Sequence, residues 1–288
     1  MSVVLITGAS SGIGLATALH FARHGYTVYA GLRNPAGADE LHKTVAAEAL
    51  PITPVRIDVD VDDSVRQGVQ EVLDRAGCID VLVNNAGVGG GGPIELVPLE
   101  AARRTFETNY FGAIRMIQAV VPGMRERRSG AIVNITSLAG RVTWAAHGHY
   151  SASKHALEAA SEALAMEVRP YNIRVAIIEP GVILTPIFSK RTKNAPTDHY
   201  EVPIRRLRRF FENRLRDPVL PNVVAEAVMT AVETDNPKLR YLVGEDAEVI
   251  APKRRETTDE EWVGDGSEMT DEEFGDRMRK RYGADFFG

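Results

Sequence analysis

Short runs of apolar, largely β-branched residues alternate along this chain with longer stretches whose apolar residues recur at helical spacing. The runs lie at residues 3–6, 27–30, 55–57, 79–83, 131–135, 173–178 and 241–243. Polar and apolar residues do not alternate within them, which is typical of strands buried on both faces. Strands that alternate with helices form βαβ units and a parallel sheet. The pattern therefore predicts a doubly wound α/β fold, with helices on both faces of about seven parallel strands in the order 3-2-1-4-5-6-7.

Two segments depart from this alternation. The expected helices cover residues 12–23, 36–50, 62–76, 99–127 and 150–168. An arginine-rich insertion occupies residues 184–221, and a polar, acidic extension occupies residues 252–288. We see no internal repeat and expect residues 1–288 to form a single domain.

The C-terminal extension is strongly acidic. Every charged side chain in the range 256–276 is Asp or Glu. The pairs Thr258/Glu261 and Thr270/Glu273 have the spacing of a capping box, so short helices can begin there. A solvated tail is the favoured interpretation of the extension, and a flap over a site or a neighbouring subunit is the alternative.

Composition excludes several classes of protein. Of 288 residues, 44% are hydrophobic and 25% charged, which is typical of a globular chain, and the net charge of −5 argues against nucleic acid as a partner. The single cysteine, Cys78, cannot form an internal disulfide, and no cluster predicts a metal site. The N-terminus lacks the features of a signal peptide, and no apolar stretch approaches membrane-spanning length. We expect a cytoplasmic protein with no stable membrane insertion.

A glycine-rich segment joins the first strand to the first helix. Gly8 would permit a tight turn, Gly12 would let a dinucleotide approach the backbone, and Gly14 would let the helix pack closely on the strand. The phosphates would then lie near the positive end of the helix dipole. This segment predicts nucleotide binding.

The spacing of Gly8, Gly12 and Gly14 resembles that of the short-chain dehydrogenase/reductase family, and the resemblance extends over roughly residues 3–186. It is carried further by Asn84-Asn85-Ala86-Gly87 and by Pro180-Gly181 with Thr185-Pro186. The family implies a Rossmann-like fold, with the first of these motifs beside the adenosine and the second around the nicotinamide. The resemblance also implies that Asp58 and Val59, which follow the third strand, contact the adenine. The full set of implied cofactor contacts is Gly8, Ser10, Ser11, Gly12, Ile13, Gly14, Asp58, Val59, Asn85, Ala86, Gly87, Tyr150, Lys154, Pro180, Gly181, Ile183 and Thr185.

Tyr150 and Lys154 are four residues apart, so on a helix they share one face. Ser137 ends the fifth strand at its carboxyl edge, where such sheets bind ligands. With Asn109, these residues match the catalytic tetrad of the family. The resemblance implies that Tyr150 is the general acid/base, that Lys154 also holds the nicotinamide ribose, and that Asn109 keeps a water in a proton relay.

The residue types suit hydride transfer between a carbonyl and an alcohol. A free tyrosine titrates near 10, which is too high for a base at neutral pH. An adjacent ammonium and a positively charged nicotinamide both favour the phenolate, so we expect the pKa of Tyr150 to be lowered. Ser137 would hydrogen-bond the substrate oxygen as charge develops on it.

The end of the second strand bears on the choice of coenzyme. NAD-preferring relatives usually carry an acidic residue at the position that Leu32 occupies here, and Arg33 follows it. A guanidinium can hold the 2′-phosphate with paired hydrogen bonds, and Ser10 or Ser11 could add a hydroxyl. We predict NADP(H), with NAD(H) and a solvated Arg33 as the alternative.

The substrate should be bound by variable segments near Tyr150. Their apolar residues suggest a secondary alcohol or ketone that is steroid-, retinoid- or polyketide-like, although ordinary loop packing would use the same residue types. The candidates are Val142, Trp144, Ile187 and Phe188. His147 and His149 are either substrate contacts or solvated loop residues.

The basic run at 205–211 has an apolar edge, which favours a lid helix over the pocket or, alternatively, a helix lying on a membrane.

Two other functions fit parts of the pattern. Sugar-nucleotide epimerases share the Tyr-x-x-x-Lys spacing, and a non-catalytic nucleotide sensor would keep the fold. By analogy with the family we expect a homodimer or homotetramer.

Overall fold

The computed structural model describes residues 2–188 and 198–288. Seven strands form one sheet in the order β3-β2-β1-β4-β5-β6-β7, and every neighbouring pair is parallel. The strands are β1 (Val3–Thr7), β2 (Thr27–Leu32), β3 (Ile52–Arg56), β4 (Val81–Asn84), β5 (Gly130–Ile135), β6 (Ile173–Pro180) and β7 (Arg240–Val243). The predicted doubly wound fold and strand order are confirmed.

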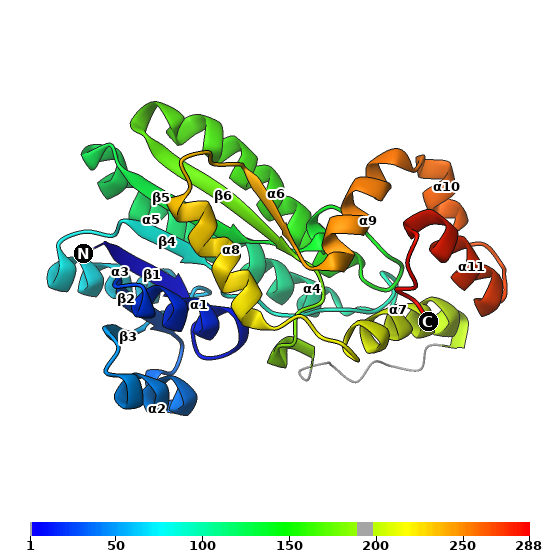
Figure 1. Cartoon of the computed structure of the whole chain (residues 1–288), viewed down its shortest axis with the longest axis horizontal. Coiled ribbons are helices and arrows are strands. Elements are labelled where there is room, and N and C mark those ends of the chain that lie inside the picture. Colours follow the sequence, from blue (N-terminus) through cyan, green and yellow to red (C-terminus); the bar gives the residue numbers. More distant parts are fainter. Residues whose placement is uncertain (1, 189–197) are drawn as a thin grey trace.

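Helices cover both faces of the sheet (Figure 1). One face carries α1 (Gly12–Arg23), α2 (Asp39–Glu48) and α8 (Pro221–Glu233), and the other carries α3 (Asp62–Ala76), α5 (Gly112–Arg127) and α6 (Gly148–Val168). Within β1, Val4 and Ile6 join the first apolar core, whereas Val3 and Leu5 join the second. Because side chains of a strand alternate between faces, burial of both faces explains the continuous apolar runs.

The long helix expected at 99–127 is interrupted. It consists of α4 (Leu99–Phe106), a π-helical segment η2 (Glu107–Phe111) and α5. At the junction, a Cβ on Gly112 would lie 2.7 Å from Cγ2 of Val59, so the helix passes very close to the chain after β3. Asn109 is buried within the π-helical segment. Such segments occur frequently at functional sites.

The insertion and the extension fold together at one end of the sheet (Figure 1). The insertion supplies η5 (Pro186–Phe188), η6 (Asp198–Tyr200) and α7 (Glu201–Arg214), and the C-terminal part supplies α9 (Glu245–Glu256), α10 (Asp259–Gly264) and α11 (Asp271–Tyr282). Both predicted capping boxes are present, at the starts of α10 and α11. The short helices predicted there are therefore confirmed.

The extension is not a solvated tail, and that expectation was wrong. Phe274, Met278 and Tyr282 are four residues apart, so they share one face of α11, and all three are buried. They form a third apolar core with Phe210 of α7 and with Phe287 near the C-terminus. The rings of Phe210 and Phe287 lie 5.1 Å apart.

Charges hold the same two helices together. The carboxylate of Asp271, the first residue of α11, pairs with Arg205 at 2.9 Å, Arg206 at 3.2 Å and Arg209 at 3.3 Å. The hydrogen bond from Arg205 lowers the pKa of Asp271. The basic run of the insertion thus neutralises part of the acidic extension, and the apolar edge of α7 is buried at Phe210. Within the described parts of the chain, no helix has the length and apolar character needed to cross a bilayer.

Candidate active site

The glycine-rich segment lies between β1 and α1, as the sequence predicts. Gly8 and Gly12 adopt φ values of +67° and +56°, in the left-handed region that favours glycine. A Cβ on Gly14 would lie 2.4 Å from both the carbonyl oxygen of Gly8 and Nδ2 of Asn85. The close passage of α1 over this turn therefore excludes any larger residue at position 14.

The Asn84–Gly87 motif fastens this turn to β4. Nδ2 of Asn85 donates to the carbonyl oxygens of Thr7 at 2.9 Å and of Gly8 at 3.2 Å. In return, the backbone amides of Asn85 and Ala86 donate to Oγ1 of Thr7, each at 3.1 Å. The side chain of Asn85 is therefore committed to shaping the glycine turn, which leaves the backbone of the motif to face a nucleotide.

The segment after β6 closes the opposite side of the turn. A Cβ on Gly12 would lie 3.1 Å from Cγ2 of Thr185, so the start of α1 and the predicted nicotinamide segment meet. Ile183 is bridged to Val219 and is buried in the apolar core beneath α1 and α8. Gly12 thus lies between the glycine-rich turn and the segment after β6, at the N-terminus of α1.

Asp246 anchors the Pro180–Gly181 segment and was not identified from the sequence. It is fully buried, its Oδ2 accepts from the amide of Val182 at 2.8 Å, and burial raises its pKa. A Cβ on Gly181 would lie 1.9 Å from Oδ1 of Asp246. The only sequence signal was an acidic residue in the first turn of α9, and that position is common for solvated Asp.

The candidate adenosine end lies at the ends of β2 and β3. Leu32 is buried, whereas Arg33 is exposed directly after it. Burial raises the pKa of Asp60, and the positive charge of Arg33 opposes this rise. Arg33 therefore lies near Asp60 and the segment that contains Asp58 and Val59. Ser10 is exposed, and Ser11 makes no side-chain capping bond to α1. The residues predicted to read the 2′ position therefore lie at one edge.

Tyr150, Lys154 and Ser137 come together at the carboxyl edge of the sheet. Nζ of Lys154 lies 5.9 Å from the ring centre of Tyr150 and donates to the carbonyl oxygen of Ile135 at 3.0 Å. Ser137 hydrogen-bonds the Tyr150 hydroxyl, and its Oγ also lies 3.4 Å from the carbonyl oxygen of Pro180. The serine is therefore placed between the phenol and the predicted nicotinamide segment.

Asn109 reaches the same place from the π-helical segment. Its Oδ1 accepts from the amide of Val88 at 2.8 Å, and its Nδ2 donates to Oγ of Ser153 at 3.1 Å. A Cβ on Gly87 would lie 3.3 Å from Oδ1 of Asn109 and 3.8 Å from Nζ of Lys154. All four residues of the predicted tetrad thus lie around the end of β4, but the side chain of Asn109 ties loops together.

The pKa values differ from the expectation for Tyr150. Burial raises the pKa of Tyr150, and the hydrogen bond from Ser137 opposes the rise only in part. Burial also lowers the pKa of Lys154 to about 8, against the negative charge of Glu158. The predicted lowering of the phenol pKa by the ammonium is therefore not found in the protein alone, because desolvation outweighs it. Tyr150 here is a neutral phenol, the form that donates a proton.

Aromatic residues of the loop before α6 and of α7 pack on one another and reach Tyr150 through His147. The ring of His147 stacks on that of Tyr150 at 4.8 Å, and Phe211 of α7 packs edge-on against His147 at 5.8 Å. Trp144 lies 5.3 Å from Phe210, and Nε1 of Trp262 in α10 donates to the carbonyl oxygen of Thr143 at 3.0 Å. The insertion and the extension together form one wall beside the phenol.

Val142 and Ile187, two of the substrate candidates, lie in different surroundings. Val142 is fully buried in the third apolar core, so it packs the fold and does not line a pocket. A Cβ on Gly89 would lie 3.2 Å from Cγ1 of Ile187, which places Ile187 against the glycine-rich loop after β4. The side chain of Phe188 lies outside the described residues. Among the residues that the structure describes, no group of His, Cys, Asp and Glu could hold a metal ion.

Two curated proteins are similar over most of the chain. 3-Ketodihydrosphingosine reductase from Bacteroides thetaiotaomicron is 36% identical over 256 residues, covering 88% of this chain and 91% of that protein. Retinol dehydrogenase 8 from Bos taurus is 40% identical over 202 residues, covering 68% of this chain and 64% of that protein.

Solved structures and a family model agree with these similarities. A short-chain dehydrogenase from Streptomyces avermitilis has a TM-score of 0.81 at 35% identity, covering 93% of this chain and 98% of its own. Relatives crystallised with NAD (Burkholderia phymatum; TM-score 0.78, 25% identity, 88% and 93% covered) and with NADP (Burkholderia cenocepacia; TM-score 0.70, 28% identity, 91% and 95% covered) support a nicotinamide cofactor. Residues 2–196 match the family described as short chain dehydrogenase. The chain belongs to this family of oxidoreductases.

Proposed function

We propose that the protein moves a hydride between NADP(H) and a secondary alcohol or ketone, with Tyr150 as the general acid/base. The observation that carries the proposal is the hydrogen bond between Ser137 and the Tyr150 hydroxyl, with Lys154 behind the ring at 5.9 Å. A phenol, a hydroxyl and an ammonium at one point can hold a carbonyl oxygen and exchange one proton with it.

The nicotinamide coenzyme, when bound, supplies or accepts the hydride. Ser137 then holds the substrate oxygen, and Tyr150 donates a proton to it during reduction or removes one during oxidation. Lys154 stabilises the resulting phenolate by its charge and offers hydrogen bonds to the nicotinamide ribose. Burial raises the pKa of Tyr150 and so favours the neutral phenol, which is the proton donor in reduction. Oxidation needs the phenolate, so a cationic partner must then lower this pKa.

An apolar substrate is supported by the wall beside Tyr150. Phe211 reaches Tyr150 through His147, Trp144 packs on Phe210, and Ile187 lies against the loop after β4, so apolar side chains gather on this side of the molecule. The names of the two curated relatives, a ketodihydrosphingosine reductase and a retinol dehydrogenase, also denote apolar ketones or alcohols. A steroid-, retinoid- or polyketide-like molecule remains the proposed class.

A substrate panel with both coenzymes, followed at 340 nm, tests the proposal. Coenzyme oxidation with apolar ketones, or reduction with the matching alcohols, is expected. No turnover with any compound would favour the nucleotide sensor, and NAD released only on denaturation would favour the epimerase. A cytoplasmic location and a homodimer or homotetramer stay predictions.

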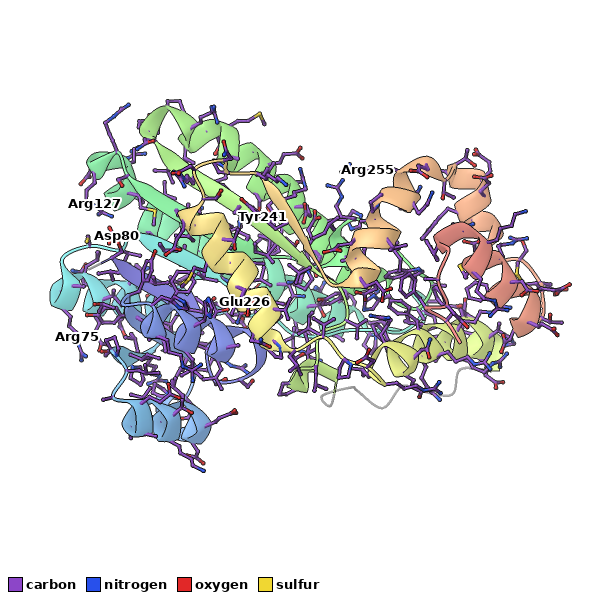
Figure 2. The ribbon with its side chains drawn as sticks, in the orientation of Figure 1. Arg75, Asp80, Arg127, Glu226, Tyr241 and Arg255 are labelled. Atoms are coloured by element: carbon purple, nitrogen blue, oxygen red, sulfur yellow. The ribbon has the colours of Figure 1, made fainter. Side chains whose placement is uncertain are left out.

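Replacing Arg33 with Asp should reverse the coenzyme preference. The change removes the exposed guanidinium and puts a carboxylate where a 2′-phosphate would lie, so the ratio of kcat/KM for NADP to that for NAD should fall about 100-fold. Arg75→Asp is the matched control, because Arg75 is an exposed residue of α3 at the far end of the sheet (Figure 2). An unchanged ratio in Arg33→Asp would remove Arg33 from coenzyme recognition.

A further inference from the structure

A buried carboxylate lies one helical turn behind Lys154. Glu158 follows Lys154 by four residues on α6 and is only 5% exposed. Its Oε1 accepts from Oγ1 of Thr136 at 2.6 Å, and its Oε2 accepts from Nε of Arg240 at 2.9 Å. Two such donors fix the carboxylate in place.

Glu179, near the end of β6, accompanies Glu158. It is 2% exposed, and it lies beside Glu158 because both carboxyls contact Nε of Arg240. Nε of Arg240 lies 3.3 Å from Oε1 of Glu179, and Nη1 of Arg141 lies 3.8 Å from the same atom. Burial raises the pKa of Glu179, and the negative charge of Glu158 raises it further. The negative charge of the pair therefore resides mainly on Glu158.

A surface cleft gives this pair access to solvent. The cleft has a volume of about 580 Å³ and is lined by Arg141, Glu179 and Arg240, among others. Tyr241 of β7 and Arg255 of α9, which also line it, lie where these two elements approach each other (Figure 2). Protons can thus reach Glu179 from a side of the sheet that the proposed substrate and coenzyme do not occupy.

We propose that Glu158 is a positioning residue that keeps Lys154 protonated during turnover, with Glu179 and Arg240 holding its charge in place. The inference rests on the proposed function, since Lys154 assists Tyr150 only as an ammonium. Burial lowers the pKa of Lys154 to about 8 even though the charge of Glu158 opposes this loss. Without that charge, Lys154 would lose its proton within the physiological range.

The charged groups around Glu158 come from every element packed against it. They are Lys154 and Glu162 on α6, Arg141 after β5, Glu179 on β6 and Arg240 on β7. The two arginines have the same charge as Lys154, so they cannot favour its ammonium form. As rising pH ionises Glu179, a second negative charge appears beside Glu158. Lys154 is thereby held charged as the pH rises.

The test replaces Glu158 with Gln, which keeps the shape and an acceptor for Thr136. The pKa of Lys154 is measured by NMR in protein labelled with 15N-lysine, without substrate or coenzyme, and its signal is assigned with the Lys154→Arg variant. In Glu158→Gln this pKa should fall by about one unit. In turnover, the alkaline limb of the kcat profile should move down by about one pH unit, so that kcat falls about eightfold at pH 8.5 and changes little at pH 6.5. Glu158→Asp should restore part of both values.

Glu162→Gln is the matched control. Glu162 also pairs with Arg240, at 3.3 Å, but its side chain is 55% exposed and lies two turns from Lys154. Glu162→Gln should leave the titration of Lys154 and the pH profile of kcat unchanged. An equal shift in this variant would overturn the proposal. An unchanged pKa of Lys154 in Glu158→Gln would also overturn it. If Glu158→Gln does not fold, Thr136→Val removes one donor to Glu158 and should give a smaller shift in the same direction; no shift there also overturns it. Because the titration needs no turnover, it is independent of whether the proposed reaction is correct.

Discussion

Replacing Tyr150 with Phe is expected to lower kcat about 1,000-fold while the protein stays folded. The variant loses only the hydroxyl that bonds Ser137 and would exchange a proton with the substrate. The ring contact with His147 at 4.8 Å remains, so the thermal midpoint and the affinity for NADPH should stay near those of the parent protein. Initial rates at saturating substrate, with thermal unfolding and NADPH fluorescence titration, measure these three quantities.

Tyr171→Phe is the control for loss of a phenolic hydroxyl. Tyr171 is a partly exposed residue after α6, with its ring beside Arg125, far along the chain from the proposed site. Its turnover should match that of the parent. Full activity in Tyr150→Phe would instead mean that another group supplies the proton, and the proposed mechanism would fail.

Replacing Gly14 with Ala should damage coenzyme binding and stability together. The added methyl would lie 2.4 Å from the Gly8 carbonyl oxygen and from Nδ2 of Asn85, and the carbonyl belongs to the turn itself. Either α1 moves away or the turn changes shape, so the free energy of unfolding should fall by about 2 kcal/mol. A displacement of about 1 Å at the phosphate-binding turn should lower kcat/KM for the coenzyme about 100-fold.

Gly264→Ala provides the comparison for Gly14. A Cβ on Gly264, the last residue of α10, would meet nothing within 4 Å, so coenzyme kinetics and stability should be nearly unchanged. Denaturant unfolding and NADPH kinetics on both variants separate the two cases. Parent-like kcat/KM in Gly14→Ala would show that the turn does not hold the coenzyme.

The sheet could be predicted from the sequence because its signals are local. Most strands contain a continuous apolar run, as in Val3–Thr7 or residues 175–178, and parallel strands with crossover helices permit few strand orders. The candidate site followed for the same reason, since Ser137 and the Asn84–Gly87 motif each come directly after a strand. The carboxyl ends of parallel strands meet at one edge, so such residues come together in space.

The features that could not be predicted depend on contacts between distant residues. The π-helical segment at 107–111 keeps the helical apolar pattern, and next to it Gly112 passes close to Val59, a contact that no local pattern reveals. The buried role of Val142 and the rise in the pKa of Tyr150 likewise follow from burial, which comes from tertiary packing. For α11, the capping box was readable, but its pairing with α7 joins Asp271 to Arg205 across 66 positions.

The third apolar core also sets the order in which the protein can be completed on the ribosome. The strands of the sheet are all synthesised by residue 243, whereas Phe286 and Phe287, which pack with Phe210, are synthesised only after them. A nascent chain can therefore form its nucleotide-binding framework while α7 still lacks the helix that neutralises its arginines. The third apolar core is completed only once these two phenylalanines are available, so the packing around α7 is fixed later than the sheet.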